Sequence, residues 1–268
     1  MSAPNDTYEV YALRYATRAS RKSQEYFRYD LYGCPDDAQR TDYFFWLLRN
    51  GDRTVLVDCG FDKARGLAKS RVQETDPIEL LARMNVSPAD VDHIVISHMH
   101  YDHIGNVGLF PNATFSLARE EYEFWSGPYG NRELMRAIVD PDELRTVRDL
   151  DRQQRVHCIE GEEKVFPGVV ATRLGGHTPG QLMVEVRAIS GGVVLASDAA
   201  HYYEEIDRDR PFKLFDDLGD TYRALDILRE LRAQPGTTVI PGHDPRVTAE
   251  FHTVAPNCLD LTAPARDS

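Results

Sequence analysis

The stretch Ser97-His98-Met99-His100-Tyr101-Asp102-His103-Ile104-Gly105-Asn106 organises the architecture expected of this chain. It contains four potential metal ligands within six residues, at the end of a short apolar run. Imidazole and carboxylate groups bind zinc and related divalent metals. His98 and His100 alternate, so an extended backbone would point both to one side. Asp102 and His103 are adjacent, and a turn or helix start would aim them at a different point. The spacing therefore favours a site for two metal ions over a site for one. It also favours a metal site over a histidine-rich surface loop without a function.

The composition is typical of a soluble globular protein. Hydrophobic residues make up 42% of the 268 residues and charged residues 28%. The net charge of −12 argues against nucleic acid or an anionic membrane as a partner, because both require a basic surface. Residues 1–10 lack the apolar core of a signal peptide, and no stretch approaches the ~20 apolar residues of a membrane span. The four cysteines, Cys34, Cys59, Cys158 and Cys258, form no Cys-x-x-Cys pair. We therefore expect a cytoplasmic protein with reduced thiols.

The segment before the motif predicts strands and one helix. Residues 8–13 alternate as in a strand, and the rest of 1–42 is expected to be a partly irregular arm. Its aromatic residues would suit a homodimer contact or a pocket wall, or would simply pack on the domain. Two apolar runs flank Asn50-Gly51 and predict a hairpin. Asp58 ends its second strand and is a candidate to hold a metal-bound histidine through the other ring nitrogen. A helix is expected to begin at Pro77, capped by Asp76, before strand 93–97 leads into the motif.

The segment after the motif is less regular. Residues 109–150 are expected to be mostly helical, with one helix over 120–125. A second helix is predicted over 221–232, capped by Asp220. Residues 256–268 are expected to fray as a flexible tail, and the whole chain, 1–268, is predicted to be a single domain.

Three further predicted strands end in His or Asp. Strand 169–174 leads into Gly176-His177, strand 193–197 into Asp198, and strand 237–240 into Gly242-His243. Loops at one edge of a rigid sheet are where functional residues gather, so we expect these side chains to lie beside the motif. The glycines would leave room for the backbone to approach the metal cluster.

The four strand ends supply enough ligands for two metal ions, and all of them are nitrogen or oxygen. The predicted ligands are His98, His100 and His177 for the first metal, Asp102, His103 and His243 for the second, and Asp198 as a bridge. This ligand set favours Zn²⁺, with Mn²⁺, Co²⁺ or Fe²⁺ as alternatives.

His98-Met99-His100-Tyr101-Asp102-His103, followed in order by His177, Asp198 and His243, resembles the metallo-β-lactamase superfamily over about residues 44–244. The resemblance implies an α/β fold, an αβ/βα sandwich of two mixed sheets flanked by helices, with a dinuclear site at one edge. Residues 176–180, 196–203 and 241–244 most resemble the quorum-quenching N-acyl-homoserine lactonases. This implies a metal-dependent hydrolase that opens the ring of a small-molecule lactone.

In the expected mechanism, the dinuclear site lowers the pKa of a shared water towards ~7. The resulting hydroxide attacks the lactone carbonyl. Asp102 is expected to pass the proton. Well-known lactonases of this group carry a catalytic tyrosine three residues after the bridging aspartate, where this chain has His201, followed by Tyr202 and Tyr203. Tyr202 or His201 would donate a hydrogen bond to the carbonyl or leaving oxygen. The candidates for an apolar groove are Phe45, Trp46, Tyr129 and the N-terminal tyrosines.

Other reactions on the same site stay open: hydrolysis of another lactone, an ester, a thioester of the glyoxalase II type, a β-lactam or a phosphodiester. Glutathione thioesterases usually have a basic C-terminal patch, and residues 245–268 contain only Arg246 and Arg266. The charge of −12 disfavours a nuclease. A single-iron persulfide dioxygenase would differ in its metal count. A purely structural zinc site would be closed and four-coordinate, unlike this larger ligand set.

Overall fold

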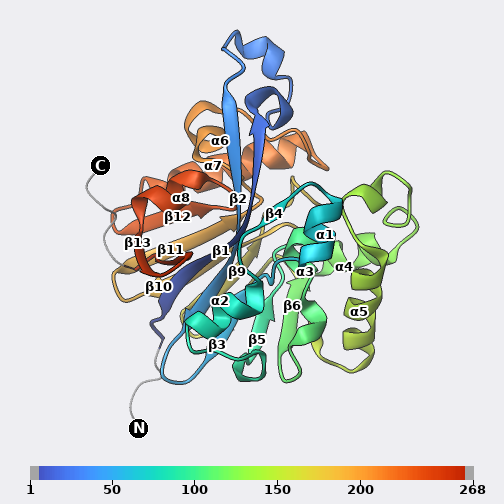
Figure 1. Ribbon diagram of the computed structural model, residues 1–268, viewed down its shortest axis with the longest axis vertical. Coiled ribbons are helices and arrows are strands. Elements are labelled where there is room, and N and C mark those ends of the chain that lie inside the picture. Colours follow the sequence, from blue (N-terminus) through green and yellow to red (C-terminus); the bar gives the residue numbers. More distant parts are fainter. Residues whose placement is uncertain (1–5, 263–268) are drawn as a thin grey trace.

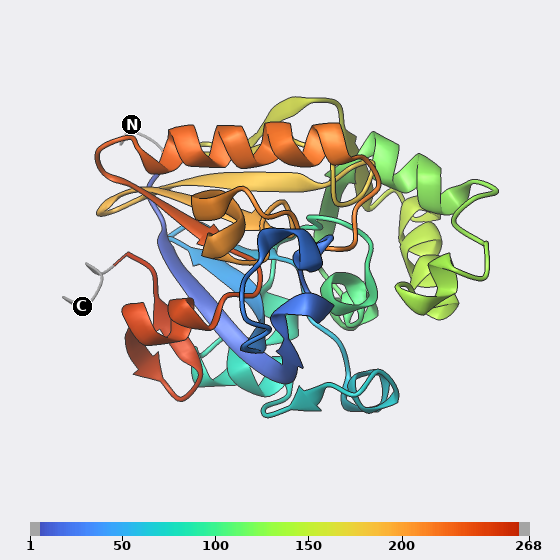
Figure 2. The ribbon, with the colours of Figure 1, turned by 90° about the horizontal axis from the view of Figure 1, so that it is seen from above.

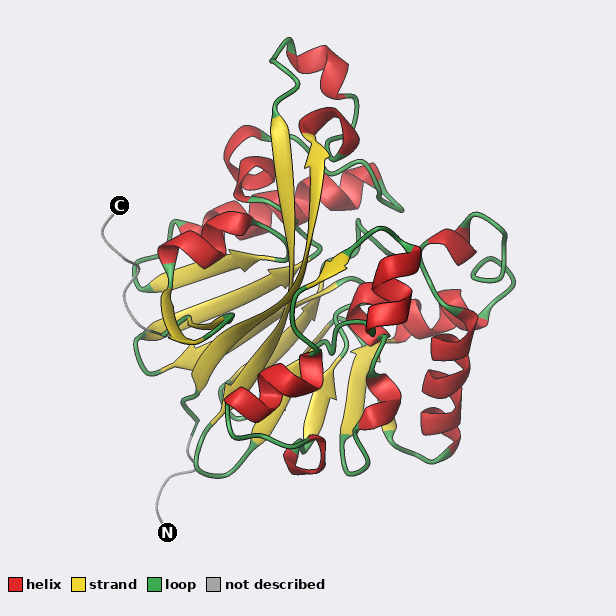
Figure 3. Ribbon diagram, viewed as in Figure 1, coloured by secondary structure: helices red, strands yellow, loops and turns green. Residues whose placement is uncertain are grey.

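Two mixed β-sheets lie face to face at the centre of the molecule, and helices cover their outer faces (Figures 1 and 3). The computed structural model describes residues 6–262. This is the αβ/βα sandwich that the sequence predicts. Within the described range, no helix combines the length and apolar character needed to cross a membrane.

The larger sheet has nine strands. Its order is β13 (His252–Ala255), β14 (Cys258–Asp260), β1 (Glu9–Arg21), β2 (Ala38–Arg49), β3 (Thr54–Val57), β5 (His93–Val95), β6 (Thr114–Ala118) and β7 (Val156–Ile159), with β4 (Val72–Gln73) paired to β1. The predicted hairpin is confirmed, because β2 and β3 pair antiparallel around Asn50-Gly51, with Trp46 opposite Val57. From β3 to β7 the strands run parallel.

The smaller sheet has five strands. Its order is β12 (Thr237–Pro241), β11 (Gly191–Ser197), β10 (Leu182–Ala188), β9 (Val169–Arg173) and β8 (Glu162–Phe166). Because β10 is antiparallel to both neighbours and β12 is parallel to β11, the strands β9, β11 and β12 share one direction. Their carboxyl ends therefore lie at one edge of this sheet.

Eight α-helices complete the described part of the chain: α1 (Lys63–Ala68), α2 (Pro77–Arg83), α3 (Tyr101–Ile104), α4 (Arg119–Ser126), α5 (Pro141–Arg152), α6 (Tyr203–Arg208), α7 (Leu218–Arg232) and α8 (Pro245–Glu250). Figure 2 shows α7 lying across the outer face of the smaller sheet. Helix α2 begins at Pro77 with the Asp76 carboxylate accepting the Ile78 N–H, as the sequence predicts.

Alternation along the strands divides the core into layers. Val10 and Trp46 of the larger sheet meet Val184 and Leu195 of the smaller sheet in the central layer, and all four are fully or almost fully buried. The residues next to them along the strands point outward. On the larger sheet these outward residues pack against α2 and α5, and on the smaller sheet they pack against α7. Removal of this apolar surface from water is the main force that holds the two sheets together.

Several local predictions are wrong. Strand β1 continues to Arg21 and pairs with β2. Only 22–37 lie between these strands, at the tip of a long hairpin (Figure 1), and they include two short 3-10 helices, Lys22–Gln24 and Tyr29–Tyr32. Residues 114–118 form the buried parallel strand β6 and not a helix. Helix α7 begins at Leu218, because Asp217 and not Asp220 provides the capping carboxylate. Residues 258–260 form β14, whereas 263–268 of the predicted tail lie outside the described residues.

The four ligand-bearing strands do not belong to one sheet. β5 lies in the larger sheet, and β9, β11 and β12 lie in the smaller one. The site therefore forms where the carboxyl edges of two packed sheets meet, and sheet packing brings the two sets of ligands together.

Candidate metal centre

The motif changes conformation where the two ligand pairs need different directions. His100, the last residue before α3, has an extended backbone with φ −70° and ψ 154°, and α3 begins at Tyr101. Asp102 and His103 therefore lie in a helical turn, while His98 and His100 precede it. This is the division that the sequence predicts.

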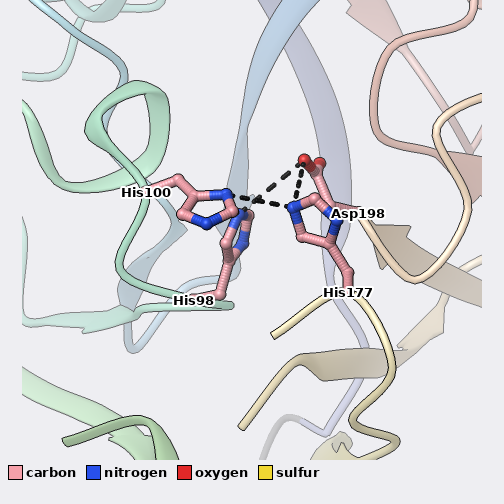
Figure 4. Close-up of side chains that lie close together, drawn as sticks. All are labelled: His98, His100, His177 and Asp198. Atoms are coloured by element: carbon pink, nitrogen blue, oxygen red, sulfur yellow. Dashed lines mark hydrogen bonds and ion pairs between the residues drawn. The ribbon is translucent and has the colours of Figure 1, made fainter. Parts of the chain in front are cut away.

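The first group of potential ligands contains His98, His100, His177 and Asp198, whose ligand atoms all lie within 4.8 Å of one another. His100 Nδ1 is 3.0 Å from both His98 Nε2 and His177 Nε2 (Figure 4). All four residues are buried. Three imidazole nitrogens that converge on one point, beside a carboxylate, form a donor set suited to a divalent cation.

The second group contains Asp102, His103 and His243. Asp102 Oδ2 lies 3.8 Å from His103 Nε2 and 3.9 Å from His243 Nε2. The seven predicted ligands thus form two neighbouring clusters with the membership that the sequence suggests, except that Asp198 falls within the first.

Asp198 lies between the two groups through its separate oxygens. Oδ2 is 3.4 Å from His177 Nε2, and Oδ1 is 3.5 Å from His103 Nε2 and 3.1 Å from His243 Nε2. A Cβ atom at Gly242 would lie only 2.7 Å from Asp198 Oδ1, so glycine is required for this approach. At Gly176 the close neighbour is the backbone of Thr221, so that glycine serves helix packing and not the cluster.

The outer ring nitrogens of the histidines have fixed partners. Nδ1 of His177 lies 2.9 Å from the Leu214 carbonyl, and Nδ1 of His243 lies 2.8 Å from the Asp42 carbonyl. His103 Nδ1 is 2.7 Å from Asp58 Oδ2, as the sequence predicts for Asp58. Such contacts hold the proton on Nδ1 and leave the Nε2 lone pair facing the cluster.

The electrostatics of the first group fit a divalent cation. Burial, together with neighbouring histidines, holds the pKa of His98 and His100 well below the usual value, and burial lowers that of His177 to about 3. Neutral imidazole is the form that binds metals. His103 Nε2 and Asp198 Oδ1 are buried and have no hydrogen-bond partner among residues 6–262. Because buried polar atoms are rarely left unpaired, these two atoms favour a cation between the groups.

Glu121, to which no sequence pattern points, joins the two loops of the first group. Its Oε1 accepts the Met99 N–H at 2.8 Å and the Trp125 indole N–H at 2.7 Å, and its Oε2 accepts the Gly180 N–H at 3.0 Å. The side chain is fully buried. Glu121 is one of three glutamates in α4, and nothing in the sequence sets it apart from Glu120 and Glu123, because its role depends on contacts between distant segments.

Replacing Glu121 by glutamine is expected to weaken metal binding at the first group roughly 10-fold, as outer-sphere changes do elsewhere. The amide NH₂ cannot accept an N–H bond, so one loop loses its anchor. Competition with a chromophoric chelator measures the affinity. Glu160→Gln, at an exposed position, is the matched control, and equal affinities of the two variants would contradict this role.

A cavity of about 460 Å³ opens onto both groups and is lined by ligands that include His100, Asp102 and Asp198. His201 also lines it, stacks on Phe212 at 3.6 Å between ring centroids and places Nε2 3.1 Å from Asp198 Oδ2. Burial lowers the pKa of His201, but the Asp198 and Glu205 carboxylates outweigh burial and raise it to about 10. His201 Nε2 is therefore held towards Asp198 at the cavity wall.

The tyrosines and the predicted groove residues lie elsewhere. The hydroxyls of Tyr202 and Thr41 are 2.7 Å apart, and Tyr202 is not among the residues that line the cavity. Phe45 and Trp46 are completely buried in the core, and Tyr129 is 63% exposed, so the predicted groove is wrong for these three. The apolar residues of the cavity wall are instead Tyr43, Tyr101, Ile138, Phe212 and Leu214.

Comparison with known sequences gives a family match over most of the chain. Residues 40–243 match the model of the "Metallo-beta-lactamase superfamily". An N-acyl homoserine lactonase of Bacillus sp is 28% identical over 215 residues, which cover 74% of this chain and 80% of the relative. The N-acyl homoserine lactonase AttM of Azorhizobium caulinodans is 32% identical over 174 residues, 63% of this chain and 64% of that protein.

Solved structures share the fold. A quorum-quenching N-acyl homoserine lactone lactonase superposes with a TM-score of 0.71 at 24% identity and covers 89% of this chain and 92% of its own. AidC, a dizinc quorum-quenching lactonase in complex with a product, has a TM-score of 0.73 at 16% identity, with 96% of this chain and 95% of its own covered. At these identities the similarity establishes the architecture alone.

Proposed function

The chain belongs to the metallo-beta-lactamase superfamily, a family of hydrolases, and we propose that it is a dinuclear metal-dependent lactonase. The observation that carries the proposal is Asp198, whose two oxygens face two separate histidine groups at the floor of a cavity. The names of the relatives support a lactone as substrate, and N-acyl-homoserine lactone is the first candidate. We expect the chain to fold as a single domain and to act in the cytoplasm. A homodimer contact through the N-terminal arm also stays a prediction.

The residues proposed to hold the metals are those of the two groups: His98, His100 and His177 for the first, Asp102, His103 and His243 for the second, and Asp198 for both. Zn²⁺ is the favoured metal for this nitrogen and oxygen set. When bound, the metals would supply an activated water at neutral pH and polarise the substrate carbonyl.

The protein's own groups then position the substrate and move its protons. The Asp102 carboxylate lines the cavity and would accept a proton and pass it to the leaving ring oxygen. The His201 N–H would donate a hydrogen bond to the carbonyl or leaving oxygen, the role that the sequence left open between His201 and Tyr202. Phe212 stacks on His201 and fixes the plane of its ring.

The deciding experiment is metal analysis of the pure protein followed by a hydrolysis panel of lactones, thioesters and phosphodiesters in a pH-stat. We expect two equivalents of metal, the largest kcat/KM for lactones, and loss of activity after chelation that Zn²⁺ restores. A protein that opened neither acyl-homoserine lactones nor simple γ-lactones would refute the proposal. Faster hydrolysis of thioesters would support the glyoxalase II type of alternative.

Replacing His201 by phenylalanine is expected to lower kcat about 10²-fold, the scale of a positioned proton donor. Phenylalanine preserves a ring for stacking on Phe212 and removes both N–H groups. Tyr202→Phe is made in parallel, and we expect a smaller loss of kcat from it, because that hydroxyl bonds to Thr41. A larger loss in Tyr202→Phe would assign the role to the tyrosine.

A further inference from the structure

The unpaired charges on the cavity wall are positive, although the chain carries a net charge of −12. The cavity is lined by three acids, Glu25, Asp102 and Asp198, and by three non-histidine cations, Arg18, Arg71 and Lys213. Glu25 forms an ion pair with Arg18. Asp102 and Asp198 belong to the two metal groups. Arg71 and Lys213 are thus left without a carboxylate, since neither forms an ion pair with any described residue.

Arg71 is held in place by contacts that do not neutralise it. Its Nε donates to the Tyr101 hydroxyl at 3.0 Å, its Nη1 donates to the Lys69 carbonyl, and its guanidinium lies 5.8 Å from the centroid of the Tyr43 ring. The residue is half-buried, and within the described structure its Nη2 has no hydrogen-bond partner. A fixed, partly desolvated guanidinium with free N–H groups is suited to bind a carboxylate.

Lys213 contributes a second charge from another segment. Its backbone N–H donates to the Glu25 carbonyl at 2.7 Å, which ties it to the tip of the β1–β2 hairpin. Its neighbour Phe212 stacks on His201. The side chain is exposed at the cavity, and its ammonium group has no partner among the described residues. A cleft with a local excess of positive charge concentrates anions, even in an acidic protein.

The lactone ring that is opened is itself neutral and would lie against the metal groups. Arg71 and Lys213 would therefore bind a second, anionic group on the substrate. We propose that this enzyme prefers lactones whose side arm carries a carboxylate, bound by Arg71 and Lys213. Apolar wall residues such as Ile138 and Leu214 would contact the carbon chain between the ring and the carboxylate. The inference rests on the proposed lactonase function and narrows its substrate class.

A matched pair of substrates tests this preference. N-adipoyl homoserine lactone and N-hexanoyl homoserine lactone have the same chain length and differ by a terminal carboxylate in place of a methyl group. We expect a KM about tenfold lower for the adipoyl compound, the effect of one hydrogen bond to a charged group. Raising the salt concentration should shrink this ratio, because the screening length falls to ~3 Å at 1 M.

Variants locate the effect. Arg71→Met and Lys213→Met remove a charge and keep an unbranched side chain, and each is expected to reduce the ratio of the two KM values several-fold. Lys164→Met, at an exposed position on β8 outside this cavity, should keep the wild-type ratio. Because Lys213 is exposed, its variant keeps the test decisive if Arg71→Met does not fold.

Calorimetric binding of the two ring-opened products to the metal-loaded protein separates the inference from the function. If the adipoyl and hexanoyl lactones had equal KM values, and their ring-opened products equal Kd values, the carboxylate preference would be overturned and the lactonase function would stand. A tenfold tighter Kd for N-adipoyl-homoserine without opening of either lactone would support the carboxylate site and refute the lactonase function.

Discussion

Replacing His100 by alanine is expected to abolish both metal binding at the first group and hydrolysis. His100 Nδ1 lies 3.0 Å from the nitrogens of both His98 and His177, so this side chain is central to the group. Its loss removes one of the three imidazoles that converge on the first group and leaves His98 and His177 without the nitrogen that lies between them. Because a catalytic metal supplies several kcal/mol of transition-state stabilisation, kcat/KM should fall by roughly 10³-fold or more.

The measurement pairs elemental analysis with steady-state kinetics on the same preparation. His157→Ala is the matched control, because His157 is exposed and pairs with Glu163 on the protein surface. The control should keep wild-type metal content and activity, and circular dichroism should show both variants folded. Retention of full metal content and activity by His100→Ala would make the ligand assignment wrong.

Replacing Asp58 by alanine is expected to damage both the second metal group and the fold. Asp58 is fully buried and adopts a left-handed conformation, with φ 63°. Its carboxylate accepts the Ser97 N–H at 2.8 Å and the Ser97 hydroxyl at 2.7 Å, and it lies 2.7 Å from His103 Nδ1. One side chain therefore fixes both the start of the motif and the orientation of a ligand.

The expected loss of metal affinity is about 10- to 100-fold, as for other carboxylates that hold a metal-bound histidine. Loss of the buried carboxylate also leaves the Ser97 N–H and hydroxyl without their acceptor, which lowers the free energy of unfolding by about 3 kcal/mol. Asp58→Asn separates the two effects: its amide oxygen can still accept the Ser97 N–H, so we expect it to lose metal affinity with a smaller loss of stability.

Metal titration and urea denaturation of the metal-free protein measure these quantities. Asp226→Asn, at an exposed position on α7, controls for the change in net charge. An Asp58→Ala variant with wild-type affinity and stability would show that Asp58 positions neither Ser97 nor His103.

The sequence predicts correctly those features of the site that depend on residues close together in the chain. The alternation of His98 and His100, and the adjacency of Asp102 and His103, set their directions through local backbone geometry. His177, Asp198 and His243 could be found because each follows an apolar run that reads as a buried strand. The strand β6 was missed although residues 114–117 alternate between polar and apolar, because this short run lies in a stretch that was expected to be helical. Its burial depends on parallel pairing with β5 and β7, which no local pattern shows.

The choice between His201 and Tyr202 shows the limit of local reasoning. Both follow Asp198 within four residues, and nothing in their order says which side chain faces the metals. In the structure, Glu205 accepts the backbone N–H groups of both residues at the start of α6. This turn directs the His201 ring towards Asp198 and the Tyr202 hydroxyl towards Thr41.

The sequence alone was sufficient to pick out seven candidate metal ligands and to separate His98 and His100 from Asp102 and His103, because spacing within one strand end is fixed by covalent geometry. Only the tertiary structure decided that two sheets and not one provide the ligands, that Glu121 ties their loops together, and that Arg71 and Lys213 share a cavity wall. These contacts join segments far apart in the chain. Their positions depend on how the two sheets pack through their apolar faces, which no local pattern encodes.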